Sequence, residues 1–429
     1  MNRIKYILLL STLLASGLQG AFVSVRDGGF FIGDEPYSYV GTNMWYGAIM
    51  GSEGQGGDRQ RLCQELDTLC ALGIKNVRVL VGGEGMYNNL PDHIRPTLQP
   101  RPGEYNDTLL AGLDFMMAEM GKRGMRAVLY LHNAWQWSGG YGAYLEWAGM
   151  GRPTPAVVWN QYTRHHSQFV RNDSARAMAL RHTRFIVSRT NTITGLAYKD
   201  DPTLMAWEVC NEPRAFAHDD ITKQGLLNWI REQSETIKEI DPQHLVTTGS
   251  EGYYGCESDI ELYEQIHSLP TIDYLCIHIW PYTWGWTGRF VSPNSKARQE
   301  LPLTILSDQL YLVFRRTESY MDLHHSVARR LRKPLVCEEF GYPRDSFEIA
   351  PGTPTTSRDL YYKYVMSFVG PDRQLSGCNF WAWGGSAQPL HPMWQPWDPY
   401  TGDPSQEEQG LYSVFLTDST LHLFLKRLS

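Results

Sequence analysis

The segment LMAWEVCNEPRAF, residues 204–216, joins an apolar strand to a polar end. Its first half has the large apolar side chains that a buried strand carries. Its second half places four charged or amide side chains within seven residues: Glu208, Asn211, Glu212 and Arg214. Such groups avoid burial, so this strand end is either leaving the core for solvent or forming a chemical site.

Seven other apolar segments of similar length start near residues 37, 75, 125, 244, 274, 334 and 377. Helical patterns alternate with them, at about 59–72, 108–123, 175–190, 222–240, 259–268, 303–332 and 358–368, with a last helix from about 419. Strand–helix alternation repeated eight times predicts a parallel (β/α)8 TIM barrel. No linker or shift in composition divides the chain, so we expect a single domain.

Three segments are longer than a barrel needs as connections: 82–107, 135–173 and 384–412. Each follows a strand, so each is expected on the C-terminal face of the strands, where barrels carry active sites. Many of the 14 tryptophans and 24 tyrosines occur in polar, Gly-rich surroundings where a core does not need them. Aromatic loops gathered on one face predict a groove.

Charge and composition narrow the class of partner. The chain has 429 residues, 42% of them apolar and 20% charged, which is typical of a globular protein with a sizeable core. Its formal charge is −7 and it has no long basic run, which argues against a nucleic-acid partner. A neutral polar substrate suits this composition, and we expect the protein to be a monomer.

The N-terminus, MNRIKYILLLSTLLASGLQGAF, has two basic residues before a short apolar run and then small residues. This pattern predicts a secretory signal peptide over residues 1–20, with a mature catalytic domain at 21–429 that has no membrane span. No cysteine follows the apolar run, so we expect a secreted or periplasmic protein without a lipid anchor there. Most of the seven cysteines are expected to be buried and free.

Polar and aromatic side chains are expected to converge at the carboxyl rim of the barrel. Strand alternation points Arg78 into the barrel from the second strand. The other rim candidates come at the ends of the fourth, sixth, seventh and eighth strands: Asn211, Glu212, His278, Glu338, Glu339 and Trp381. Taken singly, each has an ordinary structural explanation, such as a solvated acid or a buried histidine. Together at one barrel face they are hard to explain as packing.

Two glutamates across a barrel mouth suit glycoside hydrolysis, in which one carboxyl donates a proton and the other attacks or stabilises the anomeric carbon. Other chemistries fit less well. The histidine pairs at 165–166 and 324–325 lack the spacing that puts two metal ligands on one helix face, and we expect them on helix surfaces. Phosphate-loop and thiol-nucleophile signatures are also incomplete.

The segment TNTITGLAYKDDPTLMAWEVCNEPR, residues 190–214, closely resembles glycoside hydrolase family 5, specifically its β-mannanase branch. GTNMWYG at 41, WSGGYGAYLEW at 137, HLVTTGSEGYYG at 244 and PLVCEEFG at 334 resemble the same branch. The resemblance implies that Glu212 is the general acid/base and Glu339 the nucleophile of a retaining mechanism, without metal or cofactor. The two carboxyl groups would then be roughly 5 Å apart.

By the same resemblance Arg78 and His278 orient and charge-stabilise the nucleophile, Asn211 contacts the sugar near C2, and Trp381 is the stacking platform. Trp45 and Trp135 are added as expected substrate contacts. One position departs from the pattern, because many members have a tyrosine two residues after the histidine, where this chain has Trp280. We therefore keep both Trp280 and Tyr282 as candidates for that role.

The predicted activity is hydrolysis of β-1,4-mannosidic bonds in mannan, glucomannan, galactomannan or manno-oligosaccharides, with endo cleavage as the first expectation. The alternative is exo cleavage, by a β-mannosidase or mannobiohydrolase, if segment 384–412 folds across the groove. A β-glucanase and a sugar-binding barrel without catalysis are remoter alternatives. The last is disfavoured because both carboxylates and Arg78 are present.

Overall fold

A computed structural model describes residues 20–86, 92–153, 155–287 and 303–428 of the chain. The predicted signal peptide therefore lies almost entirely outside the described residues. Within them, no helix is long and apolar enough to cross a membrane.

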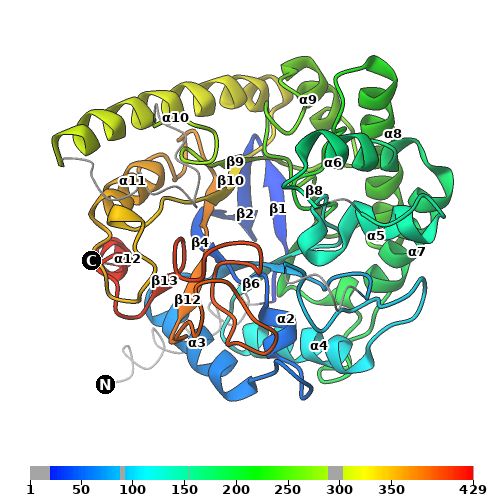
Figure 1. Cartoon of the computed structure of the whole chain (residues 1–429), viewed down its shortest axis with the longest axis horizontal. Coiled ribbons are helices and arrows are strands. Elements are labelled where there is room, and N and C mark those ends of the chain that lie inside the picture. The colour runs from blue at the N-terminus through cyan, green and yellow to red at the C-terminus, as the bar shows by residue number, and fades with distance from the viewer. Residues whose placement is uncertain (1–19, 87–91, 154, 288–302, 429) are drawn as a thin grey trace, which may run out of the picture.

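Eight parallel strands form the barrel, hydrogen-bonded in the order β8-β7-β6-β5-β4-β11-β10-β9 (Figure 1). They are β4 (Tyr39–Asn43), β5 (Asn76–Leu80), β6 (Arg126–Tyr130), β7 (Leu204–Glu208), β8 (Leu245–Thr247), β9 (Leu275–Ile279), β10 (Leu335–Phe340) and β11 (Gly377–Phe380). Between the end strands β8 and β9, the amide of Asp273 donates to the carbonyl of Val246 at 2.8 Å. The predicted (β/α)8 barrel is confirmed.

The longer helices surround the barrel: α3 (Arg59–Ala71), α4 (Asp107–Lys122), α7 (Asp173–Val187), α8 (Asp220–Ile240), α9 (Ile260–His267), α10 (Leu303–Leu331), α11 (Thr356–Met366) and α12 (Leu421–Leu428). Several begin where an Asn or Asp side chain accepts hydrogen bonds from first-turn amides, at Asp58, Asn106, Asn172, Asp219 and Asp259. These caps explain why the predicted helix starts lie within a few residues of the observed ones.

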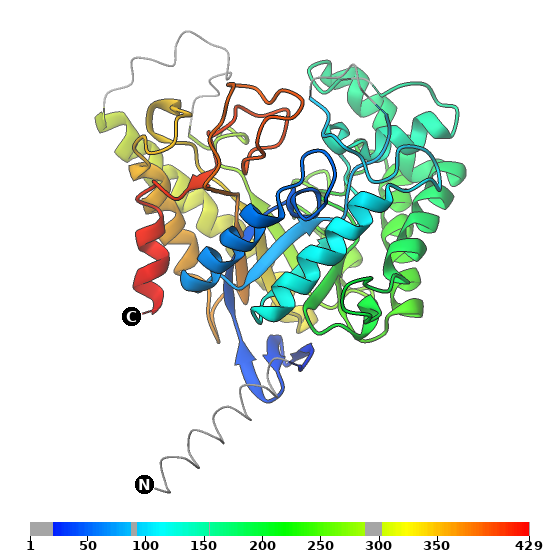
Figure 2. The same ribbon diagram turned by 90° about the horizontal axis from the view of Figure 1, so that it is seen from below.

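Shorter elements fill the connections after the strands. They are α2 (Gly47–Met50), α5 (Gly140–Trp147), α6 (Trp159–His166), the 3-10 turns η1 (Gln136–Ser138), η2 (Phe169–Arg171), η3 (Tyr198–Asp200) and η5 (Asp345–Phe347), and the parallel pair β12 (Trp383–Gly385) and β13 (Val414–Phe415). Figure 2 shows the long connections gathered at one end of the barrel. The expected crowding of loops on one face is therefore observed.

An antiparallel sheet of β1 (Val23–Arg26), β2 (Gly29–Ile32) and β3 (Glu35–Tyr37) lies at the opposite end of the barrel (Figure 2). Its Phe30 ring packs edge-on against Tyr274, with 5.2 Å between ring centroids. Phe30 is buried, so this small sheet closes the amino-terminal end of the barrel.

The expectation that the histidine pairs lie on helix surfaces is wrong for one member of each pair. His166 and His324 are fully buried. The imidazole of His324 accepts from the amide of Tyr253 at Nε2, 2.7 Å away, and pairs with the carbonyl of Tyr320 through Nδ1 at 2.6 Å. Both imidazole nitrogens thus have partners, which makes the burial of a neutral histidine acceptable. All seven cysteines are free, as expected, and five of them are buried.

Candidate active site

Arg78 lies in β5 and points into the barrel, where it is fully buried. Its Nε and Nη2 atoms donate to the two carboxylate oxygens of Glu208, at 2.6 and 2.5 Å. Its Nη1 atom donates to Oε1 of Glu339 at 2.5 Å. One guanidinium therefore holds a structural carboxylate in β7 and a rim carboxylate in β10, which explains why a charged residue interrupts an apolar strand.

Amide side chains complete the surroundings of Arg78. Asn211 accepts from Nη2 of Arg78 at 2.8 Å and donates to Oδ1 of Asn133 at 3.1 Å. Asn43, at the end of β4, accepts from Nη1 of Arg78 at 3.0 Å. Asn211 is thus held beside Glu212 in a fixed orientation. Asn43 was not among the residues predicted from sequence, although it lies in the GTN segment at residues 41–43.

Glu338 and Glu339 are neighbours on β10 and would point to opposite faces of a regular strand. The pairing of β10 with β9 shifts register between Cys337 and Glu339, so a bulge lies at this point. Glu339 reaches the rim, whereas Glu338 is buried inside the barrel and accepts from the hydroxyl of Tyr274 at 3.0 Å. Burial raises the pKa of Glu338 to about 8. The two acids therefore have separate environments despite their adjacency.

Glu212 follows β7 with a φ of 51°, in the left-handed region that non-glycine residues seldom adopt. Its Oε2 atom accepts a hydrogen bond from the indole N–H of Trp135, and its Oε1 atom lies 2.9 Å from Nδ1 of His278. The amide of Glu212 donates to the carbonyl of Gly249 at 2.9 Å. The unusual backbone conformation is thus held by three contacts, as is common where strain serves a site.

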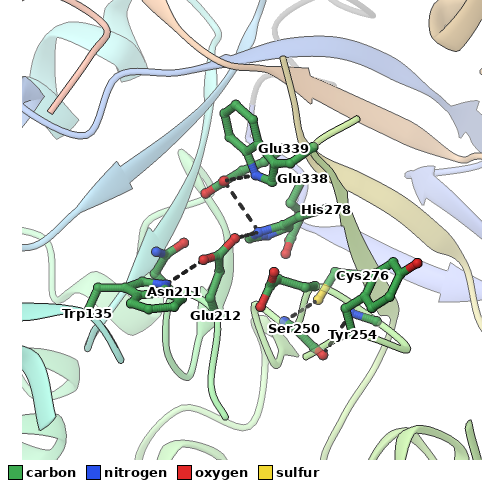
Figure 3. Close-up of polar contacts among 12 residues, drawn as sticks. Trp135, Asn211, Glu212, Ser250, Tyr254, Cys276, His278, Glu338 and Glu339 are labelled. Carbon is green, nitrogen blue, oxygen red and sulfur yellow. Dashed lines mark hydrogen bonds and ion pairs between the residues drawn. The ribbon is translucent and has the colours of Figure 1, made fainter. Parts of the chain in front are cut away.

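His278 lies between the two rim glutamates (Figure 3). Its Nδ1 atom is 2.9 Å from Oε1 of Glu212 and 3.4 Å from Oε2 of Glu339. One carboxylate oxygen of each glutamate and one nitrogen of His278 all lie within 4.8 Å of one another. Burial lowers the pKa of His278 well below its ordinary value, so the imidazole is neutral at neutral pH.

Burial raises the pKa values of both rim glutamates, and positive charge opposes the rise at each. For Glu339 the opposing charge is Arg78, in direct contact. For Glu212 it is Arg214, whose Nε atom is itself paired with Glu251 at 2.5 Å. The sequence reasoning assigned no role to Arg214 or Glu251, although both lie in segments that carried the family resemblance.

Trp280 donates its indole N–H to Oε2 of Glu339 at 3.2 Å. It therefore makes the contact that the sequence pattern leads one to expect from a tyrosine. Tyr282 instead packs its ring near Phe347, with 4.9 Å between centroids. Trp381 lies edge-on to Trp280 at 5.9 Å and is only 3% exposed.

Segment 384–412 folds over one side of the barrel mouth and is anchored on the loops that follow β4 and β5 (Figure 1). Its Gly402 carbonyl accepts from the indole N–H of Trp45 at 2.9 Å, and Ser405 donates to the carbonyl of Asp92 at 2.8 Å. Trp45 is buried, and its indole N–H supports this segment.

Two groups of described residues are arranged so that they could hold a cation: Glu212, His278 and Glu339 at the rim, and the buried residues Glu84, His132 and His182. In the rim group, hydrogen bonds from Arg78, Trp135 and Trp280 already occupy the carboxylates. In the second group, Tyr144 lies within hydrogen-bond distance of both Glu84 and His132, at 3.3 Å from each. Residues of both groups therefore already take part in hydrogen bonds within the protein.

Comparison with known proteins gives a consistent result. A family model described as "GH family 5 beta-mannosidase-like" matches residues 20–429. A putative mannan endo-1,4-beta-mannosidase 9 of Oryza sativa subsp. japonica is 31% identical over 360 residues, covering 82% of this chain and 77% of the relative.

Solved structures agree with the sequence matches. A mutant of the family 5 mannosidase from Rhizomucor miehei, in complex with mannosyl-fructose, superimposes with a TM-score of 0.81 at 31% identity, covering 95% of this chain and 96% of that one. An endo-beta-1,4-mannanase from Thermotoga petrophila has the same fold at 22% identity, with a TM-score of 0.64, covering 92% of this chain and 76% of that one.

Proposed function

The chain belongs to the β-mannosidase-like group of glycoside hydrolase family 5 and is a glycosidase that cleaves β-mannosidic bonds; from this premise we propose that it acts by a retaining mechanism at chain ends. In this proposal Glu212 is the general acid/base, Glu339 the nucleophile, and the product is mannose released from the non-reducing ends of manno-oligosaccharides or mannan.

Charge supports the division of roles between the two glutamates. Glu339 has a direct ion pair with Arg78 and accepts from Trp280, and both contacts favour its ionised, attacking form. Among the described residues, the only ionisable group in ion-pair contact with Glu212 is His278, which burial keeps neutral. A buried carboxyl without a cation in contact is the one that retains its proton, so Glu212 supplies the acid.

The spacing supports retention of configuration. A carboxylate oxygen of Glu212 and one of Glu339 lie within 4.8 Å of each other. Retaining enzymes place their two carboxyl groups about 5–5.5 Å apart, whereas inverting ones leave room for a water at about 6.5–9.5 Å. Glu339 would attack the anomeric carbon as Glu212 protonates the leaving oxygen. A water activated by Glu212 would then hydrolyse the glycosyl-enzyme.

The burial of Trp381 is the observation that carries chain-end cleavage. A polymer bound through its middle needs an open platform on both sides of the cleaved bond. Trp381 is 3% exposed, and segment 384–412 lies over one side of the mouth (Figure 1). This placement supports the exo alternative over endo cleavage, which was the first expectation from sequence.

The departing part of the substrate has room on the other side of the mouth. A cavity of about 430 Å³ lies there, with Trp159, Arg214, Phe216, Tyr254 and Trp284 among its lining residues. Trp159 is 49% exposed and its ring stacks 6.2 Å from that of Trp135, which contacts Glu212. Aromatic rings leading away from the acid suit the sugars of a leaving group.

Two measurements test the proposal. Proton NMR of aryl β-D-mannoside hydrolysis should show β-mannose as the first-formed anomer, and α-mannose would contradict retention. On soluble unbranched mannan, reducing ends should accumulate while viscosity stays nearly constant, because only chain ends are shortened. An early collapse of viscosity would contradict chain-end cleavage. Monomeric state and export remain predictions from sequence.

A further inference from the structure

Glu84 is a buried carboxyl in the loop after β5 that the mechanism does not use. Its Oε2 atom accepts from the amide of Gly140 at 3.1 Å, and its Oε1 atom lies 3.3 Å from the hydroxyl oxygen of Tyr144. Gly140 is the first residue of α5, and Tyr144 lies one turn further along the same helix. The carboxyl of Glu84 therefore joins the loop after β5 to the helix in the loop after β6.

The two loops are in close backbone contact at the turn before α5. The amide of Glu84 donates to the carbonyl of Ser138 at 2.7 Å. A Cβ atom at Gly139 would overlap the carbonyl oxygen of Glu84, and one at Gly140 would lie 2.6 Å from the carbonyl oxygen of Trp135. Both glycines have positive φ, 95° and 52°, which suits residues without a side chain. Glu84 thus packs on this turn, and the turn packs on the backbone of Trp135.

Asn133 continues the connection toward the proposed acid/base. Its Nδ2 atom donates to the hydroxyl oxygen of Ser138 at 2.9 Å, and its Oδ1 atom accepts from the amide of Trp135 at 3.1 Å. The indole N–H of Trp135 in turn donates to Oε2 of Glu212. A shift of the turn would therefore move the donor that orients the Glu212 carboxyl.

The hydrogen bonds behind Tyr144 indicate that Glu84 carries a proton. Thr183 donates to Oε1 of Gln233 at 2.5 Å, so Nε2 of His132, 2.9 Å from Thr183, is a donor and Nδ1 is an acceptor. Tyr144 gives its one hydrogen to this Nδ1 atom, 3.3 Å away, so its contact with Glu84 needs a hydrogen from the carboxyl. Burial agrees with this, because it raises the pKa of Glu84 to about 8. A neutral glutamine can therefore imitate the side chain.

We propose that Glu84 is a positioning residue for the acid/base, because its carboxyl holds the turn that presents the indole of Trp135 to Glu212. This inference rests on the acid/base role proposed above. Loss of the carboxyl leaves the buried amide of Gly140 without its acceptor, so the turn shifts and the indole donor shifts with it. The step that depends on the acid should suffer most, since none of the contacts of Glu339 described above comes from this turn.

The test compares mannobiose, whose leaving sugar needs a proton, with 2,4-dinitrophenyl β-D-mannoside, whose leaving group needs little acid assistance. Glu84→Ala should lower kcat/KM about 30-fold for mannobiose, a partial loss of general acid catalysis, and less than about threefold for the aryl mannoside. Glu84→Gln should restore both values to within about threefold of wild type, because its amide can accept from Gly140 and donate to Tyr144. A general disturbance of the fold would slow both substrates equally.

The indole N–H resonance of Trp135 in the ¹⁵N-labelled enzyme, assigned with Trp135→Phe, gives a second readout. It should move upfield in Glu84→Ala, as the hydrogen bond to Glu212 weakens, and keep its position in Glu84→Gln. Glu104→Ala is the matched control, because it removes an exposed carboxyl of the same loop. It should change neither the resonance nor the rates.

If Glu84→Ala does not fold, Tyr144→Phe replaces it, since it removes one of the two contacts of the carboxyl and should give a selective loss of about fivefold. Equal rates or equal losses on both substrates in the folded variant, an unmoved Trp135 resonance, or a Glu84→Gln enzyme as slow as Glu84→Ala overturns the inference. Failure of the acid assignment is distinguishable, because Glu212→Ala itself would then lose equally on both substrates.

Discussion

At the scale of a single residue, substitution of Trp280 tests its hydrogen bond to Glu339. Its indole N–H contacts Oε2 of Glu339 at 3.2 Å and favours the ionised carboxylate. Trp280→Phe should lower kcat/KM about tenfold, the effect of one lost hydrogen bond to a charged group. It should also move the acidic limb of the kcat/KM pH profile to higher pH, because loss of the donor raises the pKa of Glu339, the proposed nucleophile.

Trp280→Tyr is the control for that variant, since tyrosine retains a donor and is the residue that the family pattern places here. Its profile should lie closer to that of the wild type. An unchanged acidic limb in Trp280→Phe would show that the indole contributes packing alone.

Glu212 should reveal its role through the leaving group. Glu212→Ala should slow the hydrolysis of mannobiose by a factor on the order of 1,000, because a sugar alkoxide needs a proton to depart. Glycosylation by 2,4-dinitrophenyl β-D-mannoside should fall far less, since that leaving group needs little acid assistance. Pre-steady-state and steady-state rates on both substrates measure the difference, and equal losses would argue against an acid role.

The sequence predicts the site unevenly, and the reasons lie at single residues. Glu212, Glu339 and Arg78 could be chosen because charged groups at the ends of apolar strands are conspicuous. Asn43 could not, because an asparagine at a strand end has no local feature that marks it. Its place in the site depends on a hydrogen bond from Arg78, in the next strand, that no local pattern records.

At the scale of elements, Asp403 holds segment 384–412 together. The amides of Gly410, Tyr412 and Ser413 all donate to its carboxylate, and Tyr412 in turn packs edge-on against Trp280 at 5.2 Å. Asp403→Ala leaves these buried amides unpaired, at about 1–3 kcal/mol each. The segment should loosen, become a site of limited proteolysis, and raise KM for aryl mannosides about tenfold.

Asp359→Ala is a suitable control for Asp403→Ala. Its carboxylate also accepts hydrogen bonds, from Ser419 and Thr420, but it lies in α11 away from the mouth. It should leave KM unchanged. Protease resistance and KM that stay at wild-type values in Asp403→Ala would show that the segment is held by its apolar contacts.

Elements were predictable where their pattern was distinctive. The eight barrel strands are continuous apolar segments and the long helices have clear caps, so their approximate positions follow from sequence. The strands β1–β3 and the helices α2, α5 and α6 have three to eight residues each, too few for a period to stand out. The bulge that separates Glu338 from Glu339 depends on pairing with neighbouring strands, which sequence alone does not show.

For the whole molecule, buried histidines predict how stability depends on pH. Burial lowers the pKa values of His93, His182 and His324 to about 4. The folded state keeps these rings neutral while the unfolded chain takes up protons below its ordinary value of about 6.5. Stability is therefore present above pH 6.5 and lost as pH falls toward 4, by on the order of 2–3 kcal/mol per buried ring.

His324→Gln tests this linkage, because glutamine does not titrate and its side-chain oxygen can still accept from the amide of Tyr253. Urea unfolding at several pH values should show a shallower loss of stability between pH 6.5 and 4, by close to one proton. His218→Gln, a substitution of an exposed histidine, is the control. Parallel pH curves for wild type and His324→Gln would contradict the assignment.

The time course of products from mannohexaose, labelled with ¹⁸O at the reducing end, tests chain-end cleavage most directly. The burial of Trp381 and the chain-end cleavage proposed from it predict unlabelled mannose and labelled mannopentaose as the first products, with labelled mannotetraose appearing only after mannopentaose accumulates. Mannobiose, mannotriose and mannotetraose appearing together at the earliest times would contradict the account, because they require binding of internal sugars across the cleavage site.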